Sequence, residues 1–151
     1  MNKRKIYVFG NPLLPEDNLP LKLAPRLGKA FPKIKFIAAD PNENLKPENE
    51  ALYIIDTIRA RSPNPEVQNL TSKFQNVKFL TRKKKVLVIK DLDQVSLNKI
   101  YSAHDLDLGF SLKLLAKIGQ LRKVIIFGVP VGMGEEEALK QLSEKILNFK
   151  F

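Results

Sequence analysis

Five short apolar runs, separated by turn-forming residues, dominate this sequence. They are KIYVFG (5–10), KIKFIAAD (33–40), ALYIID (51–56), KVLVIKD (85–91) and KVIIFGVP (123–130). Each run has the length of a β-strand, and its hydrophobic character is continuous rather than alternating. Such runs are typical of strands that are buried on both faces, as in a central sheet covered by helices. They constrain the fold more than any other feature of the chain.

Helical patterns lie between and after these runs. Residues 24–31 form a short candidate helix that contains Pro25, and a helix already running from Asn18 would be kinked there. Residues 108–119 place apolar side chains at helical spacing, and residues 134–150 carry glutamates first and lysines later, as the helix dipole favours. The alternation predicts an α/β three-layer domain with a central, mostly parallel sheet of about five strands, of the phosphorylase/hydrolase-like type.

Length and composition are typical of one globular domain that spans residues 1–151. Hydrophobic residues make up 44% of the chain, which is too many for a disordered protein. No apolar run approaches the roughly 20 residues that cross a bilayer, and the first residues contain no signal-peptide core. We therefore expect a cytoplasmic protein without a membrane partner. The absence of cysteine excludes disulfides, thiolate metal ligands and a cysteine nucleophile.

The net charge of +10 is compatible with nucleic acid, a membrane surface or an acidic protein as partner. The densest basic cluster, TRKKKVLVIK (81–90), lies between two apolar runs. We interpret it as a turn that leads into an edge strand, where lysines oppose aggregation. No RNA-binding aromatic signature, zinc finger or P-loop accompanies it, so we do not expect a nucleic-acid partner.

Acidic residues follow four of the predicted strands. These residues are Asp17, Asp40, Asp56, and the pair Asp91 and Asp93. Ligands of α/β sheets collect beyond the carboxyl ends of the strands, so we expect one acidic rim. Turn formation or helix N-capping explains about half of such positions equally well, and Asp17 could cap the next helix. Asp56 differs because it closes an almost wholly apolar strand, where a carboxylate is costly unless a cation shares the site.

His104 is the only histidine, and it lies in the loop before the helix predicted over 108–119. That loop can return the imidazole to the rim that holds Asp17 and Asp56. One imidazole with two carboxylates suits a divalent transition metal, and three ligands leave coordination positions open. The simpler alternative is a histidine that hydrogen-bonds a backbone carbonyl or Asp105.

Three segments, in this order, resemble the hydrogenase maturation proteases, which trim the C-terminal tail from the large subunit of nickel-iron hydrogenase. VFGNPLLPED (8–17) is similar to the opening strand, the Gly-Asn turn and the paired acids of that family. LYIIDT (52–57) resembles a strand that ends in an aspartate, and IYSAHDLDLGFSLKLL (100–115) resembles the Ser-x-His stretch with its helix. KVIIFGVP is similar to the last strand, whereas ADPNEN (39–44) lacks the glycines of the usual Asp-Gly-Gly segment.

The resemblance implies a metal-binding and catalytic set of Asp17, Asp56 and His104, with Asp40 and Asn11 as substrate-binding residues. It implies no resident cofactor, because the nickel already installed in the precursor is the feature to be recognised. The three side chains would bind that nickel, position the nearby peptide bond, and polarise its carbonyl or activate a water. The site could also bind other divalent metals. The partner is then the large-subunit precursor, and we expect a monomer.

Two other classes of function stay open. FGNP and the positive charge also resemble peptidyl-tRNA hydrolase, an RNA-directed hydrolase, but that family has a histidine soon after this turn and the chain has none before His104. The third class is a non-cleaving hydrogenase assembly factor with the same fold, which the missing glycines after Asp40 would suit.

Overall fold

The computed structural model describes residues 3–40, 45–60, 84–90, 100–102 and 112–151. Within these ranges the strands are β1 (Arg4–Val8), β2 (Ile34–Ala38), β3 (Ala51–Ala60), β4 (Leu87–Ile89), β5 (Ile100–Ser102) and β6 (Lys123–Pro130). The helices are the 3-10 helix η1 (Pro15–Asp17), α1 (Leu19–Ala30) and α5 (Glu135–Asn148), and residues 112–117 are also helical. No helix in this described part is long and apolar enough to span a membrane.

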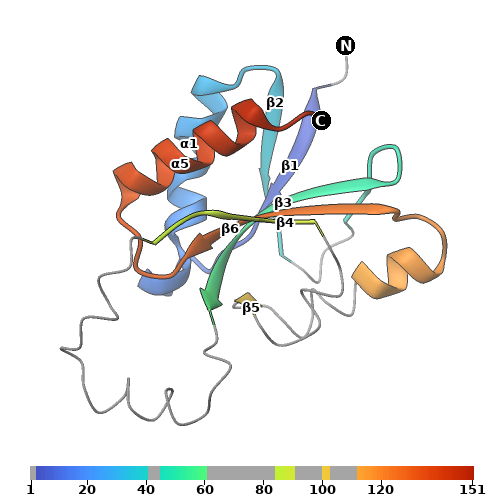
Figure 1. The fold of residues 1–151 in the computed structure, drawn as a ribbon, viewed down its shortest axis with the longest axis horizontal. Helices are drawn as coiled ribbons and strands as arrows, with labels where there is room; N and C mark the ends of the chain where they lie inside the picture. The colour runs from blue at the N-terminus through green and yellow to red at the C-terminus, as the bar shows by residue number, and fades with distance from the viewer. Residues whose placement is uncertain (1–2, 41–44, 61–83, 91–99, 103–111) are drawn as a thin grey trace, which may run out of the picture.

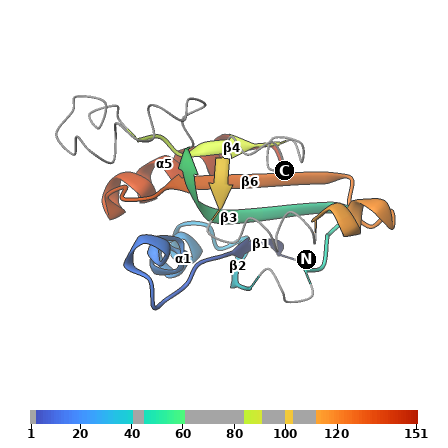
Figure 2. The same cartoon turned by 90° about the horizontal axis from the view of Figure 1, so that it is seen from below.

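The strands form one mixed sheet in the order β2-β1-β3-β6-β4, and β5 pairs with the end of β3. β1, β2, β3 and β6 are parallel, whereas β4 is antiparallel to β6 and β5 is antiparallel to β3. Figure 2 shows β4, β6, β3 and β1 following one another across the sheet. The predicted α/β fold with a mostly parallel sheet is confirmed. Each predicted run contains a strand, and β5 is one that the sequence did not predict.

Helices cover both faces of the sheet, so the predicted three layers are also confirmed. Ile6 and Val8 of β1 point to the face on which α1 and α5 pack, and Figure 1 shows these two helices side by side. Tyr7 and Phe9 point to the opposite face, where Leu112 of the helical segment 112–117 is fully buried. Both faces are apolar because β1, β3 and β6 lie in the middle of the sheet.

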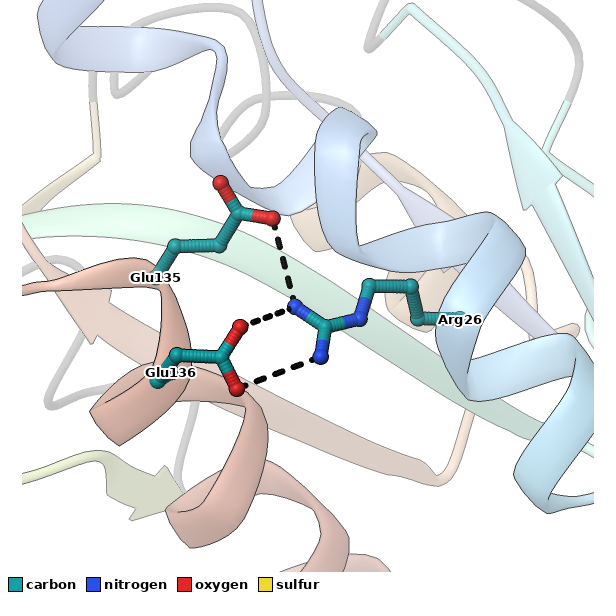
Figure 3. Close-up of polar contacts among 3 residues, drawn as sticks. All are labelled: Arg26, Glu135 and Glu136. Atoms are coloured by element: carbon teal, nitrogen blue, oxygen red, sulfur yellow. Dashed lines mark hydrogen bonds and ion pairs between the residues drawn. The ribbon is translucent and has the colours of Figure 1, made fainter.

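α1 begins five residues earlier than the predicted range of 24–31, at Leu19, so that range was wrong. Pro25 removes one helical hydrogen bond, but it is exposed, while Leu23 and Leu27 on the inner face are fully buried. Burial of this apolar face outweighs the local cost of the proline. Arg26, the next residue, contacts α5 and forms a fork with the Glu136 carboxylate, with Nη1–Oε1 at 2.6 Å and Nη2–Oε2 at 3.2 Å (Figure 3).

β4 is an edge strand, as the lysine cluster predicted, and Lys84 and Lys85 before it are exposed. Its direction corrects one expectation. β4 runs antiparallel to β6. Its carboxyl end therefore lies at the opposite end of the strands from the carboxyl ends of β1, β3 and β6. Asp91 and Asp93, which were expected at the same rim as the other acids, lie outside the described residues.

Candidate active site

Asp17 is held in place by the loop that follows β1. It is the last residue of η1 and is only 2% exposed. The backbone N–H of Asn11 donates to Asp17 Oδ2 at 3.0 Å and to the Asp17 carbonyl oxygen at 3.1 Å. The Asn11 side chain in turn accepts the N–H of Leu13 at 2.9 Å, which closes a local turn. The N-cap of α1 is Asn18, so Asp17 does not have the capping role that was the simpler alternative.

Gly10 allows the chain to return this closely. A Cβ atom at residue 10 would lie 2.5 Å from the Asp17 carbonyl oxygen and 3.1 Å from Leu21 Cγ. Real Cβ atoms do not approach a backbone oxygen to that distance, so glycine is required here by the close contact. The two residues of the Gly-Asn pair after β1 therefore have different roles. Gly10 allows the close approach of the Asp17 carbonyl oxygen, and the Asn11 N–H donates a hydrogen bond to the Asp17 carboxylate.

Asp56 lies inside β3 and is fully buried. The expectation that it ends a strand was wrong, because β3 continues to Ala60 by pairing with β6 and then with β5. Relative to β1, however, Asp56 does lie just beyond the paired residues. β1 ends at Val8, which is paired with Ile55, and Asp56 is the next residue of β3. The Asp56 Oδ1 atom accepts the backbone N–H of Thr57 at 2.8 Å.

The two aspartates lie on parts of the chain that are joined through the neighbouring strands β1 and β3. The register pairs Val8 with Ile55, and the N–H of Phe9 donates to the Ile55 carbonyl oxygen at 2.9 Å. Asp56 follows Ile55 directly, and Asn11, which holds Asp17, is two residues beyond Phe9. A buried carboxylate is expensive unless cations or hydrogen bonds compensate it. Here two buried carboxyl groups come from η1, which follows β1, and from β3. This region is suited to binding a cation.

The remaining predicted site residues divide into two kinds. Asp40 is exposed, just beyond β2, and the preceding Ala39 donates its N–H to the Val8 carbonyl oxygen at 3.0 Å, so this strand end also borders β1. Glu16, the neighbour of Asp17, is exposed. His104 lies outside the described residues, and within the described ranges no three His, Asp or Glu side chains are grouped to hold a metal.

Thr57 is a polar residue of this region that the sequence did not single out. It is 2% exposed, and within the described part of the chain its hydroxyl has no hydrogen-bond partner. It also lines a pocket of about 460 Å³, together with residues around η1 and after β6 that include Pro15, Leu19, Val131 and Met133. The available signal was its position in the apolar run IIDTI, where a second polar residue directly follows Asp56.

Three solved structures share this fold. The [NiFe] hydrogenase maturation protease HybD from Thermococcus kodakarensis superposes with a TM-score of 0.61 at 17% identity, covering 95% of this chain and 97% of that chain. The hydrogenase maturating endopeptidase HybD from E. coli gives 0.60 at 16% identity, with 95% and 90% covered. The solution structure of an endopeptidase from Escherichia coli gives 0.59 at 17% identity, again with 95% and 90% covered.

The likeness to these structures establishes the fold, at an identity too low to carry more. No protein-family model matches the chain, and no curated protein is significantly similar to it in sequence.

Proposed function

We propose that this protein is a hydrogenase maturation endopeptidase, which removes the C-terminal tail from the large-subunit precursor of a nickel-iron hydrogenase. One observation carries the proposal: a chain with the fold of such proteases buries two aspartates, Asp17 in the loop after β1 and Asp56 in the neighbouring strand β3. The nickel belongs to the precursor, so it is part of the substrate rather than a cofactor of this protein.

His104 is the third member of the proposed site, and the chain before it supports this role. β5 ends at Ser102, which pairs with Ile58, two residues beyond Asp56 in β3. His104 follows Ser102 by two residues in the sequence and itself lies outside the described residues.

The proposed set has the ligand chemistry that nickel accepts. Imidazole nitrogen binds nickel readily, and carboxylate oxygens complete a set that leaves positions for the precursor's own ligands. The Asn11 N–H donates to one oxygen of Asp17, and the Thr57 N–H donates to one oxygen of Asp56. These hydrogen bonds orient both carboxylates before a metal binds. Such outer hydrogen bonds commonly fix the geometry of metal-ligating side chains.

Burial of the two carboxylates also explains why a precursor without metal should be a poor substrate. A carboxylate at 0% or 2% exposure interacts more strongly with an entering cation than a solvent-exposed one does, because the protein interior screens charge less than water. A nickel-loaded precursor supplies that cation, and the bound metal can polarise the scissile carbonyl or activate a water. Tail removal would then report that nickel insertion is complete.

Asp40 and Asn11 complete the proposal as residues that contact the substrate around the metal. Asp40 is exposed at the end of β2, beside the β1 end from which Asn11 projects. We also propose that the protein has no resident cofactor, that its site accepts other divalent metals, and that it acts as a cytoplasmic monomer without nucleic acid.

The test is incubation of the purified protein with the large-subunit precursor from the same organism, in nickel-loaded and nickel-free forms. Mass spectrometry of the large subunit should show loss of the C-terminal tail in the loaded form alone. Binding of the loaded precursor with no change in its mass would instead identify a non-cleaving assembly factor. Equal cleavage of both forms would contradict recognition of nickel.

A further inference from the structure

A second pocket, of about 590 Å³, lies at the amino ends of three parallel strands. Its lining includes Arg4, Ala51 and Lys123, which are the first residues of β1, β3 and β6. We call it the Arg4 pocket, and its volume is within the range of roughly 300–1,000 Å³ found for ligand sites. Asp56 is five residues further along β3 than Ala51, which separates the two by about 17 Å at the usual rise of a strand. The function proposed above makes no use of this pocket.

The segment after α5, which ends beside the start of β1 (Figure 1), holds both cations of the pocket with its aromatic rings. The Arg4 guanidinium carbon lies 5.0 Å from the centroid of the Phe151 ring and 5.8 Å from that of Tyr53. Lys123 Nζ lies 5.4 Å from the centroid of Phe149, and the Phe149 and Phe151 centroids are 5.1 Å apart. Among the described residues, neither cation forms an ion pair or a hydrogen bond. Their N–H donors are therefore available to a ligand.

Glu48 is the only acid among the described residues that line the pocket, and Lys5 neutralises it. Lys5 Nζ lies 3.0 Å from Glu48 Oε1, and the Lys5 backbone N–H donates to Glu48 Oε2 at 3.2 Å. The nearby Glu50 is paired with Arg122, whose Nε lies 2.8 Å from Glu50 Oε2. The lining therefore carries two positive charges that no carboxylate offsets.

Two neutral polar residues add hydrogen-bonding groups to the lining. Asn49 is exposed in a tight turn, which is closed by two hydrogen bonds of 2.9 Å between Glu48 and Ala51. Asn49 and Glu50 have φ angles of 50° and 60°, the left-handed conformation of a type I′ turn, which asparagine tolerates well. The Tyr53 hydroxyl forms no hydrogen bond among the described residues, and it is not one of the polar atoms that the fold closes off from solvent. Both side chains are therefore available to a ligand.

We propose that the Arg4 pocket binds the phosphate group of a small phosphorylated molecule between Arg4 and Lys123. A phosphate dianion matches the two positive charges of the lining, and a guanidinium binds two phosphate oxygens at once. The pocket is larger than one phosphate group, so the rest of the molecule lies against the Tyr53 and Phe151 rings. This inference is independent of the proposed function, because it uses residues at the opposite end of β3 from Asp56.

The experiment titrates the ¹⁵N-labelled protein with inorganic phosphate at constant ionic strength and follows the backbone amides by NMR. The Tyr53 and Lys123 amides should shift and reach saturation, whereas the Thr57 amide, at the other end of β3, should not shift. Arg4→Gln and Lys123→Gln should each raise the Kd by about 10-fold or more, because each removes a charged hydrogen-bond donor. Lys145→Gln, at an exposed position of α5, removes the same charge outside the pocket and should keep the wild-type Kd.

Thermal unfolding gives a second measurement, since phosphate should raise the Tm of the wild type and of Lys145→Gln more than that of the two pocket variants. A wild-type Kd in both pocket variants would overturn the inference. Acetate that binds as tightly as phosphate would identify a carboxylate ligand and would also overturn it. Equal weakening in all three glutamine variants would indicate general attraction of anions to a chain of net charge +10, which again contradicts a specific pocket. None of these outcomes depends on tail removal, so a failure of the proposed function would leave this inference standing.

Discussion

The backbone N–H of Phe9 donates to the carbonyl oxygen of Ile55 at 2.9 Å, one residue beyond the regular pairing of β1 with β3. Asp56 follows Ile55 directly, and Asn11, which holds the Asp17 carboxylate at 3.0 Å, is two residues beyond Phe9. The main-chain N–H groups of Phe9 and Asn11 therefore help to position the two segments that carry the buried acids. Substitutions that move the backbone at this point should affect both.

Gly10→Ala should destabilise the protein by about 1–3 kcal/mol, because the new Cβ would lie 2.5 Å from the Asp17 carbonyl oxygen. Gly28→Ala is a matched control within α1, where a Cβ would meet nothing within 4 Å, and it should stabilise by about 0.5–1 kcal/mol. Urea unfolding measures both values. Equal stability of the two variants would show that the close approach at Gly10 is not a constraint.

Gly128→Ala should also destabilise the fold, since its Cβ would lie 2.7 Å from Ile58 Cδ1 and 2.8 Å from Ile58 Cγ2. Gly128 pairs with Asp56 across β3 and β6, so the strain falls beside the site. A double-mutant cycle with Ile58→Ala should give a favourable coupling of about 0.5–3 kcal/mol. If the changes in unfolding free energy of the two single variants simply add in the double variant, the new methyl group does not clash with Ile58.

Gln141→Leu should release the edge of the sheet from α5. Gln141 Oε1 accepts the N–H of the buried Val86 at 2.8 Å, and its Nε2 donates to the Lys84 carbonyl oxygen at 3.3 Å. Loss of a partner for a buried N–H costs about 1–3 kcal/mol, so unfolding should become easier and the Val86 amide should exchange faster. Lys140→Leu, at the adjacent exposed position, is the control. Unchanged exchange at Val86 in Gln141→Leu would rule out this link.

Glu136→Gln should lower stability near neutral pH but not in acid. The hydrogen bond and then the charge of Arg26 lower the pKa of Glu136 from its usual 4.5. A lowered pKa in the folded state gives stability that is present above pH 4.5 and is lost as the pH falls through the folded value. Melting curves of wild type and variant should therefore differ at pH 7 and converge in acid. They should also converge in high salt, because the Arg26–Glu136 pair is exposed and salt screens it. Glu144→Gln is the control, and a difference that persisted in acid would contradict the assignment.

The sequence predicted the sheet well because its inner strands carry continuous apolar runs. β5, with only the three residues IYS, has no such run, and it forms because β3 extends beyond Asp56 and offers it a partner. The direction of β4 was also beyond local sequence, since nothing in its three residues LVI distinguishes parallel from antiparallel pairing with β6.

For the candidate site, the sequence singled out Asp17 and Asp56 through the apolar runs that precede them, and both side chains are buried. It did not predict the structure beneath them. Gly10 is required because a Cβ there would meet the Asp17 carbonyl oxygen, which depends on the path of the loop after β1. Thr57 lines a pocket with residues after β6 and around η1, which are far from it in the sequence. Contacts of this kind leave no local sequence pattern.

The most direct measurement is tail removal from the nickel-loaded precursor by Asp17→Asn, Asp56→Asn and His104→Ala, each followed by mass spectrometry. All three should be folded by circular dichroism and slower than the wild type by at least about 100-fold, because even outer hydrogen-bond partners of metal ligands contribute about 10- to 100-fold. Glu144→Gln, at an exposed position of α5, should cleave at the wild-type rate. Wild-type cleavage by any one of the three variants would contradict the proposed site.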